Sequence, residues 1–252
     1  MSTRHAVVLL PGTVLPAELA YAALLRVLGE RVDAVAKDLE VYAEDQPPPD
    51  FGLDTEIKGI LREADEHAFS SFHLVGYSGG GASSLAFAAR YGERLLSLAL
   101  LEPAWAGNDR TPPEDALMRR FRELEPLPSE QFMAGFVRLQ LAPGVEPPPP
   151  LEGPPPAWMA TRPAGIRAFI DAFDKGELDL EALRAFDRPV YFALGGRSNG
   201  DYFGLMAERL AQIFPDFTLE TFEERHHFDP PHRIEPERLA GSLLALWRRA
   251  ET

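Results

Sequence analysis

The 252-residue sequence contains no cysteine. This absence excludes disulfide bonds, thiolate metal ligands and a cysteine nucleophile, and it suits a reducing compartment. Basic residues are also scarce, because 25 lysines and arginines stand against 39 acidic residues and give a formal net charge of −14. A surface of this charge repels a phosphate backbone, so we expect no nucleic-acid partner.

Long apolar runs are missing as well. No stretch approaches the ~18 apolar residues of a membrane-spanning helix. The apolar run near the N-terminus stops at Pro11-Gly12 and is too short for the core of a signal peptide. We therefore expect a cytoplasmic protein with no membrane span. Because 45% of its residues are hydrophobic, the chain can still bury one sizeable core.

Short apolar segments that alternate with helical stripes dominate both ends of the chain. Such alternation predicts parallel pairing, with helices on both faces of a central sheet. The sequence therefore predicts an α/β fold with a mostly parallel sheet. Strands are expected at 6–12, 31–42, 71–78, 95–105, 188–196 and 217–224, and helices at 16–30, 53–69, 79–93, 201–214 and 235–251.

This alternation breaks between residues 107 and 185, where no convincing strand is found. Helical stripes there are separated by the proline-rich segment 142–158, which favours an extended conformation. We expect residues 1–106 and 186–252 to form the core and residues 107–185 to form a helical cap or lid. The many aromatic and methionine residues of this insertion favour a small or medium hydrophobic substrate over a sugar or peptide.

The segment "VGYSGGG" contains Gly76, Ser78 and Gly80 as a G-x-S-x-G motif. An apolar strand precedes the motif and a helix of small residues follows it. A serine on such a strand-to-helix turn adopts strained dihedral angles that expose its hydroxyl group, and the flanking glycines let strand and helix approach closely. The pattern indicates that Ser78 is a nucleophile rather than part of a structural turn.

The whole chain resembles the alpha/beta hydrolase superfamily, and the likeness rests on five segments. These are "LLPGT", "HLVGYSGGG", "LLSLALLEPAW", "VYFALGG" and "FEERHHFDPPHRIEP". They are similar to the oxyanion loop, the nucleophile elbow, the following strand, the penultimate strand and the histidine loop of that family. The resemblance implies a serine hydrolase with a helical cap and a triad in the chain order serine, acid, histidine.

By this resemblance the base comes from "RHHFDPPHR", which contains His226, His227 and His232. We favour His227, because family histidines often precede an apolar residue, with His226 as the alternative. Histidine suits the role because its pKa near 6.5 lets it take and return a proton near neutrality.

A metal site is the rival interpretation of this cluster. Adjacent histidines in an extended loop point apart, and no helical His-x-x-x-His spacing supports a metal. We therefore expect no metal and no organic cofactor. The histidines at positions 5, 67 and 73 are expected to be surface or strand-end residues.

The acid is where the sequence departs from the family pattern. The position that usually holds an aspartate, after the penultimate strand, holds Asn199, and a neutral amide stabilises an imidazolium poorly. Asp201 is a nearby alternative, although it could equally cap the next helix. Some family members carry their acid at the end of the strand after the nucleophile, and Glu102 occupies that position. We favour Glu102 over Asp201.

The resemblance also assigns an oxyanion hole to the backbone N–H groups of Gly79 and Thr13. With Ser78 as nucleophile, these residues imply hydrolysis of an ester-type bond of a small molecule through an acyl-enzyme. A serine at the elbow argues against the carboxylate-nucleophile chemistry of haloalkane dehalogenases and epoxide hydrolases. Thioester hydrolysis, acyl transfer, carbon–carbon bond hydrolysis and a catalytically weak ligand-binding role remain alternatives.

Overall fold

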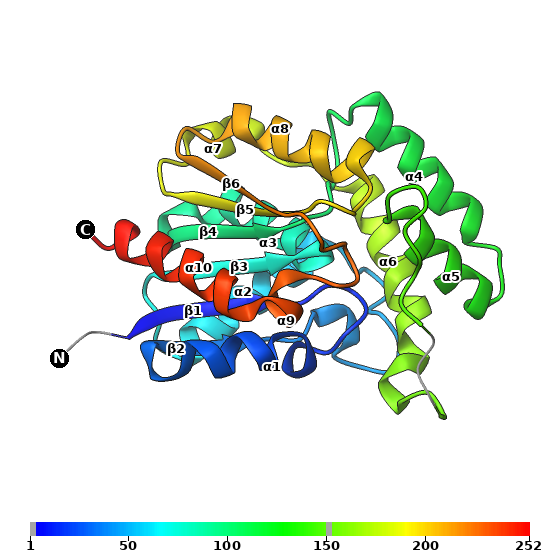
Figure 1. Ribbon diagram of the computed structural model, residues 1–252, viewed down its shortest axis with the longest axis horizontal. Coiled ribbons are helices and arrows are strands. Elements are labelled where there is room, and N and C mark those ends of the chain that lie inside the picture. Colours follow the sequence, from blue (N-terminus) through cyan, green and yellow to red (C-terminus); the bar gives the residue numbers. More distant parts are fainter. Residues whose placement is uncertain (1–3, 150–152) are drawn as a thin grey trace.

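The computed structural model describes residues 4–149 and 153–252, and a six-stranded sheet lies at its centre (Figure 1). All neighbouring strands pair in parallel, in the order β2-β1-β3-β4-β5-β6. The carboxyl ends of the strands therefore meet at one edge. The strands are β1 His5–Leu10, β2 Val32–Ala36, β3 Phe72–Tyr77, β4 Leu95–Leu101, β5 Val190–Gly195 and β6 Phe217–Phe222.

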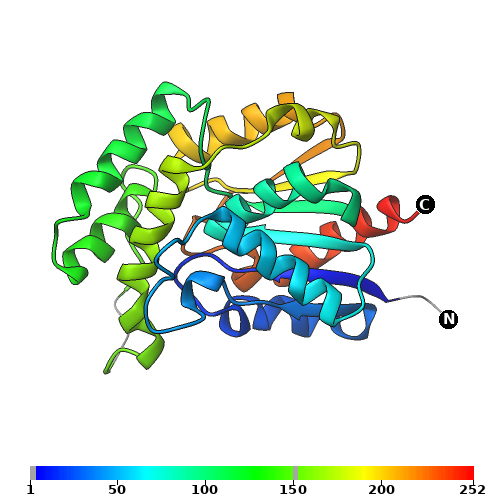
Figure 2. The ribbon, with the colours of Figure 1, turned by 180° about the vertical axis from the view of Figure 1, so that it is seen from behind.

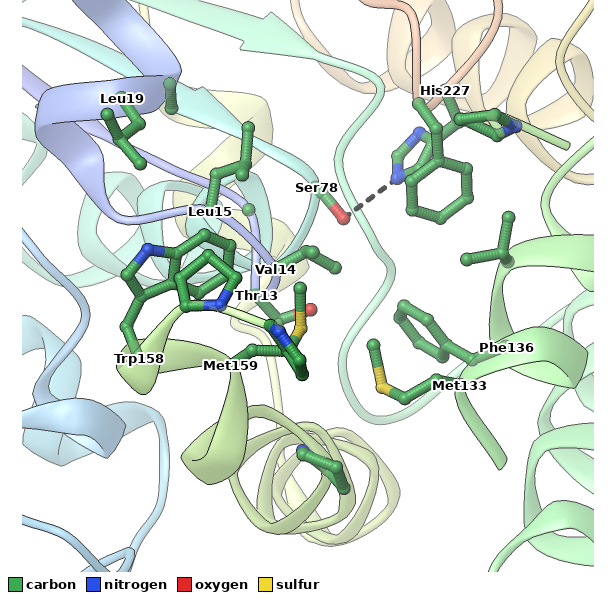
Figure 3. Close-up of a pocket in the computed structure, with 18 of the residues that line it drawn as sticks. Thr13, Val14, Leu15, Leu19, Ser78, Met133, Phe136, Trp158, Met159 and His227 are labelled. Atoms are coloured by element: carbon green, nitrogen blue, oxygen red, sulfur yellow. Dashed lines mark hydrogen bonds between the residues drawn. The ribbon is translucent and has the colours of Figure 1, made fainter. Parts of the chain in front are cut away.

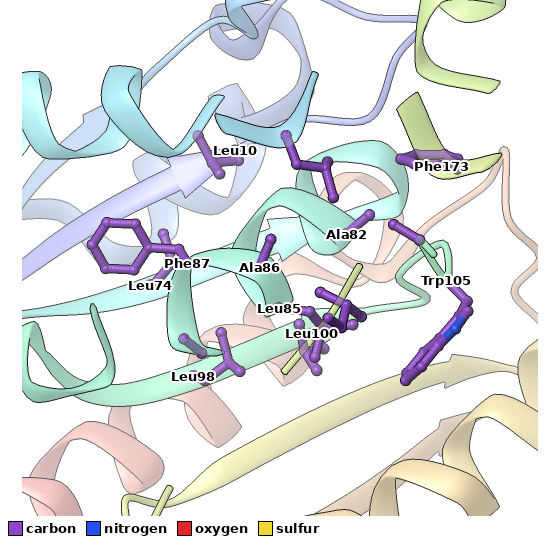
Figure 4. Close-up of a cluster of buried hydrophobic side chains, with 14 of the residues drawn as sticks. Leu10, Leu74, Ala82, Leu85, Ala86, Phe87, Leu98, Leu100, Trp105 and Phe173 are labelled. Atoms are coloured by element: carbon purple, nitrogen blue, oxygen red, sulfur yellow. The ribbon is translucent and has the colours of Figure 1, made fainter. Parts of the chain in front are cut away.

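Helices cover both faces of this sheet. Alternate residues of a strand point to opposite faces, so Val7 and Leu9 of β1 pack in one apolar cluster while Val8 and Leu10 pack in the other. The first cluster lies under α1 (Ala17–Leu28) and α10 (Pro236–Ala250). The second lies under α2 (Leu53–Glu66), α3 (Ser78–Tyr91) and α8 (Leu205–Ile213), and Figure 4 shows part of it. The predicted fold class is confirmed.

Three further helices lie together beyond the carboxyl ends of the strands, as both ribbon views show (Figures 1 and 2). They are α4 (Pro112–Leu124), α5 (Ser129–Leu139) and α6 (Arg162–Lys175). Of the described residues between 107 and 185, none belongs to a strand of the sheet. The short helix α7 (Leu180–Ala185) instead packs against α3 and α8.

The short helix α9 (Pro231–Ile234) follows the histidine loop and packs against α1 and α10. It lies at the same sheet edge that carries Ser78. In the part of the chain that the structure describes, no helix combines the length and apolar character that crossing a bilayer requires.

Replacement of Gly76 by alanine tests how closely β3 and α3 approach. The added Cβ atom would lie 2.2 Å from Ser84 Oγ and 2.7 Å from the carbonyl oxygen of Gly80. Because one of these atoms belongs to the backbone, we expect G76A to lower the free energy of unfolding by about 1–3 kcal/mol. Urea unfolding of the purified protein measures the change.

The matched control is Gly241→Ala, an exposed position on α10 where nothing lies within 4 Å of the added atom. Alanine is the better helix former, so this variant should keep or raise the stability, by up to about 1 kcal/mol. Equal destabilisation by both variants would contradict the close approach of β3 and α3.

Candidate active site

Ser78 lies where β3 ends and α3 begins, on a turn that its neighbours hold tightly. Its φ angle is +53°, a left-handed conformation that is uncommon for a residue with a side chain. The N–H group of Gly80 donates a 3.1 Å hydrogen bond to the carbonyl oxygen of Pro11, and a Cβ atom at Gly80 would lie 2.3 Å from that oxygen. The turn therefore requires glycine at position 80 and presents Ser78 to the sheet edge.

Glu102 occupies the equivalent place on the neighbouring strand. Tyr77 of β3 pairs in register with Leu101 of β4, so the next residues, Ser78 and Glu102, follow the two strands side by side. Glu102 also has a positive φ angle, of +45°. Two strained non-glycine residues at adjacent strand ends mark this edge as a candidate functional site.

His227 joins these two residues in a chain of hydrogen bonds. Its Nε2 atom lies 3.0 Å from Ser78 Oγ (Figure 3), and its Nδ1 atom lies 3.0 Å from Glu102 Oε2. The other carboxylate oxygen, Oε1, accepts a 2.8 Å hydrogen bond from the N–H group of Gly195 at the end of β5. A carboxylate that is only 4% exposed requires such partners for both oxygens. The geometry is that of a nucleophile, a base and a group that orients the base.

Aromatic rings hold the His227 imidazole in place. The Phe203 ring stacks on it at a centroid distance of 4.5 Å, and the Tyr77 ring lies 5.0 Å away. The Tyr77 hydroxyl group donates a hydrogen bond to the His227 carbonyl oxygen. Burial raises the pKa of Tyr77 well above its usual value, and the charge of Glu102 raises it further, so the phenol keeps its proton and remains a donor. Neither Phe203 nor Tyr77 was predicted as a site residue from the sequence, although Tyr77 directly precedes the serine.

The two other histidines of the loop have different surroundings. His226 accepts a 3.2 Å hydrogen bond at Nδ1 from the N–H group of Phe228, and burial lowers its pKa. His232 is fully buried, with its ring against those of Tyr21 and Tyr77. Among the described residues, only His227 hydrogen bonds to the Ser78 hydroxyl group.

The family pattern would place an aspartate in the loop after β5. Hydrogen bonds join this loop to the C-terminal end of α5. The Asn199 side chain donates a 2.8 Å hydrogen bond to the Leu139 carbonyl oxygen, and the Asn199 N–H group donates one of 3.0 Å to that of Gln140. Asp201 is exposed, within the helical turn Gly200–Gly204 that leads into α8. Among the described residues, the carboxylate that hydrogen bonds to His227 is therefore that of Glu102 and not one from this loop.

Gly79 and Thr13 lie against each other beside the serine. A Cβ atom at Gly79 would lie 2.6 Å from Thr13 Cγ2, and Thr13 is only 5% exposed. The first N–H groups of a helix have no acceptor within that helix, and Gly79 is the second residue of α3. The Tyr42 hydroxyl group donates a 2.6 Å hydrogen bond to the Thr13 carbonyl oxygen. This hydrogen bond holds the loop that contains Thr13 in position.

Ser78 and His227 lie in the wall of a cavity of about 1,230 Å³ (Figure 3). The sheet edge forms one side of this cavity, while α5 and the segment around the helical turn at 157–161 form the other. Apolar side chains make up most of its lining, including those of Val14, Leu15, Met133, Phe136, Trp158 and Met159. A cavity of this character favours apolar ligands.

A family model described as the alpha/beta hydrolase family matches residues 7–241 of the chain. The chain therefore belongs to the alpha/beta hydrolase family, and the protein is a hydrolase. The resemblance predicted from the sequence is confirmed. No curated protein sequence matches the chain significantly.

Solved structures share this fold at low sequence identity. A thermophilic esterase from Thermogutta terrifontis superposes with a TM-score of 0.72 at 18% identity, over 100% of this chain and 92% of the esterase. A meta-cleavage product hydrolase from Pseudomonas fluorescens gives a TM-score of 0.64 at 16% identity, over 98% of this chain and 91% of that one. A serine hydrolase from Cycloclasticus zankles gives 0.63 at 19% identity, over 97% and 89% of the two chains. At these identities the likeness establishes the fold.

Proposed function

We propose that the protein is a serine hydrolase that cleaves an ester-type bond through an acyl-enzyme. The observation that carries this proposal is the unbroken chain of hydrogen bonds from Glu102 through His227 to Ser78 in the wall of an apolar cavity. With Nδ1–H donating to Glu102, the free electron pair on Nε2 accepts the serine proton.

In the proposed mechanism Ser78 Oγ attacks the ester carbonyl carbon while His227 Nε2 takes its proton. The carbonyl oxygen becomes an oxyanion, which the N–H groups of Gly79 and Thr13 stabilise by hydrogen bonds. His227 then returns the proton to the leaving oxygen, so the carbon–oxygen bond breaks and an alcohol departs. A water molecule attacks the acyl-enzyme by the same route, which releases the acid and restores Ser78.

Labelling with a fluorophosphonate probe tests whether Ser78 is activated. We expect one adduct on the intact wild-type protein and none on Ser78→Ala, because an unactivated hydroxyl group reacts poorly with such a probe. Intact mass spectrometry measures both. The control is Ser129→Ala, which removes another serine hydroxyl group that lines the same cavity and should leave labelling unchanged. An adduct that persists on S78A, or a wild type that stays unlabelled, would contradict the proposed nucleophile.

We further propose that α4, α5 and α6 act as a cap that selects an apolar small-molecule substrate. The support is that α5 and the segment 153–163 supply much of the cavity wall opposite Ser78, with Met133 and Trp158 among the side chains. Burial of each additional methylene group contributes about 0.8 kcal/mol. A chain of a few carbon atoms can therefore raise the affinity for the transition state substantially.

A series of p-nitrophenyl esters tests this specificity. We expect kcat/KM to rise by roughly tenfold to a hundredfold from the acetyl to the octanoyl ester. The variant Met133→Asp places a charge in the apolar wall and should flatten the series while acetyl ester hydrolysis persists. If the acetyl ester is the best wild-type substrate, the cap does not select for apolar length, although the serine mechanism could still hold.

A further inference from the structure

Three side chains that the proposed reaction does not use meet at the opposite edge of the sheet. His5 begins β1, His73 lies at the start of β3, and Glu251 directly follows α10. Glu251 Oε1 lies 2.8 Å from His5 Nδ1 and 3.2 Å from His73 Nε2, and the three atoms all lie within 4.8 Å of one another. Two imidazole nitrogens and a carboxylate oxygen form a donor set that Zn²⁺ binds in proteins.

We propose that His5, His73 and Glu251 bind one divalent transition-metal ion of the Zn²⁺ type, with a water molecule as the fourth ligand. Tetrahedral zinc with bonds of about 2.0–2.1 Å holds its ligand atoms about 3.3 Å apart. The separations of 2.8 and 3.2 Å between the carboxylate oxygen and the two ring nitrogens need to widen by at most about half an ångström, and the two ring nitrogens lie within 4.8 Å of each other. The ion would take the place of the hydrogen atoms that the two rings now share with the carboxylate.

The surroundings hold the rings in a form that can bind a metal. His73 is fully buried, and its Nε2 atom lies 3.2 Å from Glu251 Oε1. Its other nitrogen, Nδ1, lies 2.8 Å from Ser97 Oγ, an outer contact of the kind that orients ligating histidines. The Trp247 ring stacks on His73 at 5.4 Å and also borders His5 at 5.5 Å.

Glu251 supplies the negative charge of the proposed metal site, and its exposed side chain gives an ion access to that site. Burial alone would raise the pKa of this carboxyl group, but hydrogen bonds from His5 and His73 outweigh the burial and lower it, so the group is ionised. Its side chain is 31% exposed, which leaves a route for an ion and for a bound water molecule. Two buried imidazoles and one partly exposed carboxylate thus lie close together at this edge of the sheet.

The position of this site indicates a stabilising role rather than a catalytic one. Ser78 lies at the other end of β3, about 16 Å away at 3.3 Å per residue. An ion bound here would join the first strand to the end of the last helix, across 246 positions of the chain. The expectation of no metal concerned the histidine loop, and His5 and His73 were predicted to be surface or strand-end residues; the three residues of this cluster are far apart in sequence and share no spacing motif.

Calorimetric titration of chelator-treated, full-length protein with ZnCl₂ tests the proposal. We expect one ion per chain, and a melting temperature that rises by roughly 5–10 °C at a hundredfold excess over Kd. The variants His5→Gln and Glu251→Gln keep a polar side chain of similar size near the protein surface. Each should weaken Zn²⁺ binding at least tenfold and remove most of the thermal shift, while the melting temperature without zinc changes little.

The control His67→Gln alters an exposed histidine at the end of α2 and should bind zinc as the wild type does. Fluorophosphonate labelling in parallel reports on the other sheet edge and should be unaffected by zinc. A wild type that binds no zinc would overturn the proposal, as would zinc binding that H5Q and E251Q leave intact. Zinc that blocks Ser78 labelling would place the ion at the histidine loop instead and would likewise overturn it.

Discussion

Replacement of His227 by glutamine is expected to lower kcat for ester hydrolysis by about 10⁵- to 10⁶-fold. His227 Nε2 lies 3.0 Å from Ser78 Oγ, so the substitution removes the only side chain of the described residues that hydrogen bonds to the Ser78 hydroxyl group and, in the proposed mechanism, takes its proton. A neutral glutamine side chain fills similar space but cannot take up and return a proton near neutrality. Steady-state kinetics on the best ester of the series, supported by single-turnover measurements, gives the ratio.

The matched control is His226→Gln, one residue earlier in the same loop. His226 contacts the N–H group of Phe228 and not the serine, so this variant should retain kcat to within about tenfold. Comparable losses in the two variants would show that the loop as a whole, rather than one imidazole, carries the effect. A large loss in H226Q alone would reverse the assignment of the base.

Replacement of Glu102 by glutamine is expected to lower kcat by about 10⁴-fold. The carboxylate oxygen Oε2 lies 3.0 Å from His227 Nδ1, and in the proposed mechanism it stabilises the imidazolium that forms when the serine proton is taken. Glutamine can still accept the hydrogen bond from Gly195 but lacks the negative charge, so the fold is preserved while the charge stabilisation is lost. KM should change much less than kcat, because Glu102 is not among the residues that line the cavity.

Asp201→Asn is the control for this prediction, since it removes a carboxylate of the loop that the family pattern points to. Asp201 is exposed, and we expect its variant to keep turnover close to that of the wild type. Near-wild-type turnover in E102Q together with a loss of orders of magnitude in D201N would overturn the assignment of Glu102. Near-UV circular dichroism of both variants excludes a folding defect as the cause.

Much of the architecture follows from local patterns in the sequence. The strand-and-helix alternation predicted a parallel sheet covered on both faces, and the structure has it, because the nearly continuous apolar runs of its strands are buried on both sides. The elbow at Ser78 was also predictable, since a left-handed serine between closely packed backbones requires glycine at fixed positions. The sequence signal of each of these features lies in residues that are neighbours in the chain.

Contacts between distant segments could not be predicted in the same way. Asn199 occupies the position that usually holds the acid, so the sequence left Glu102 and Asp201 as alternatives. Only the register of β3 with β4 places Glu102 beside Ser78 and within reach of His227. The Phe203 ring that stacks on His227 has no signal in the sequence, because its position depends on how the turn before α8 returns to the sheet edge.

The sequence by itself thus determined the fold class, the family resemblance and the position of the sharp turn at Ser78. The tertiary structure alone decided which of several acids and histidines meet, how the cavity closes above them, and that His5 and His73 converge on Glu251. The physical reason is that local conformation depends on residues a few positions apart. A hydrogen-bonded or metal-binding cluster instead requires atoms within about 3 Å, which only strand register and packing across the whole chain can bring together.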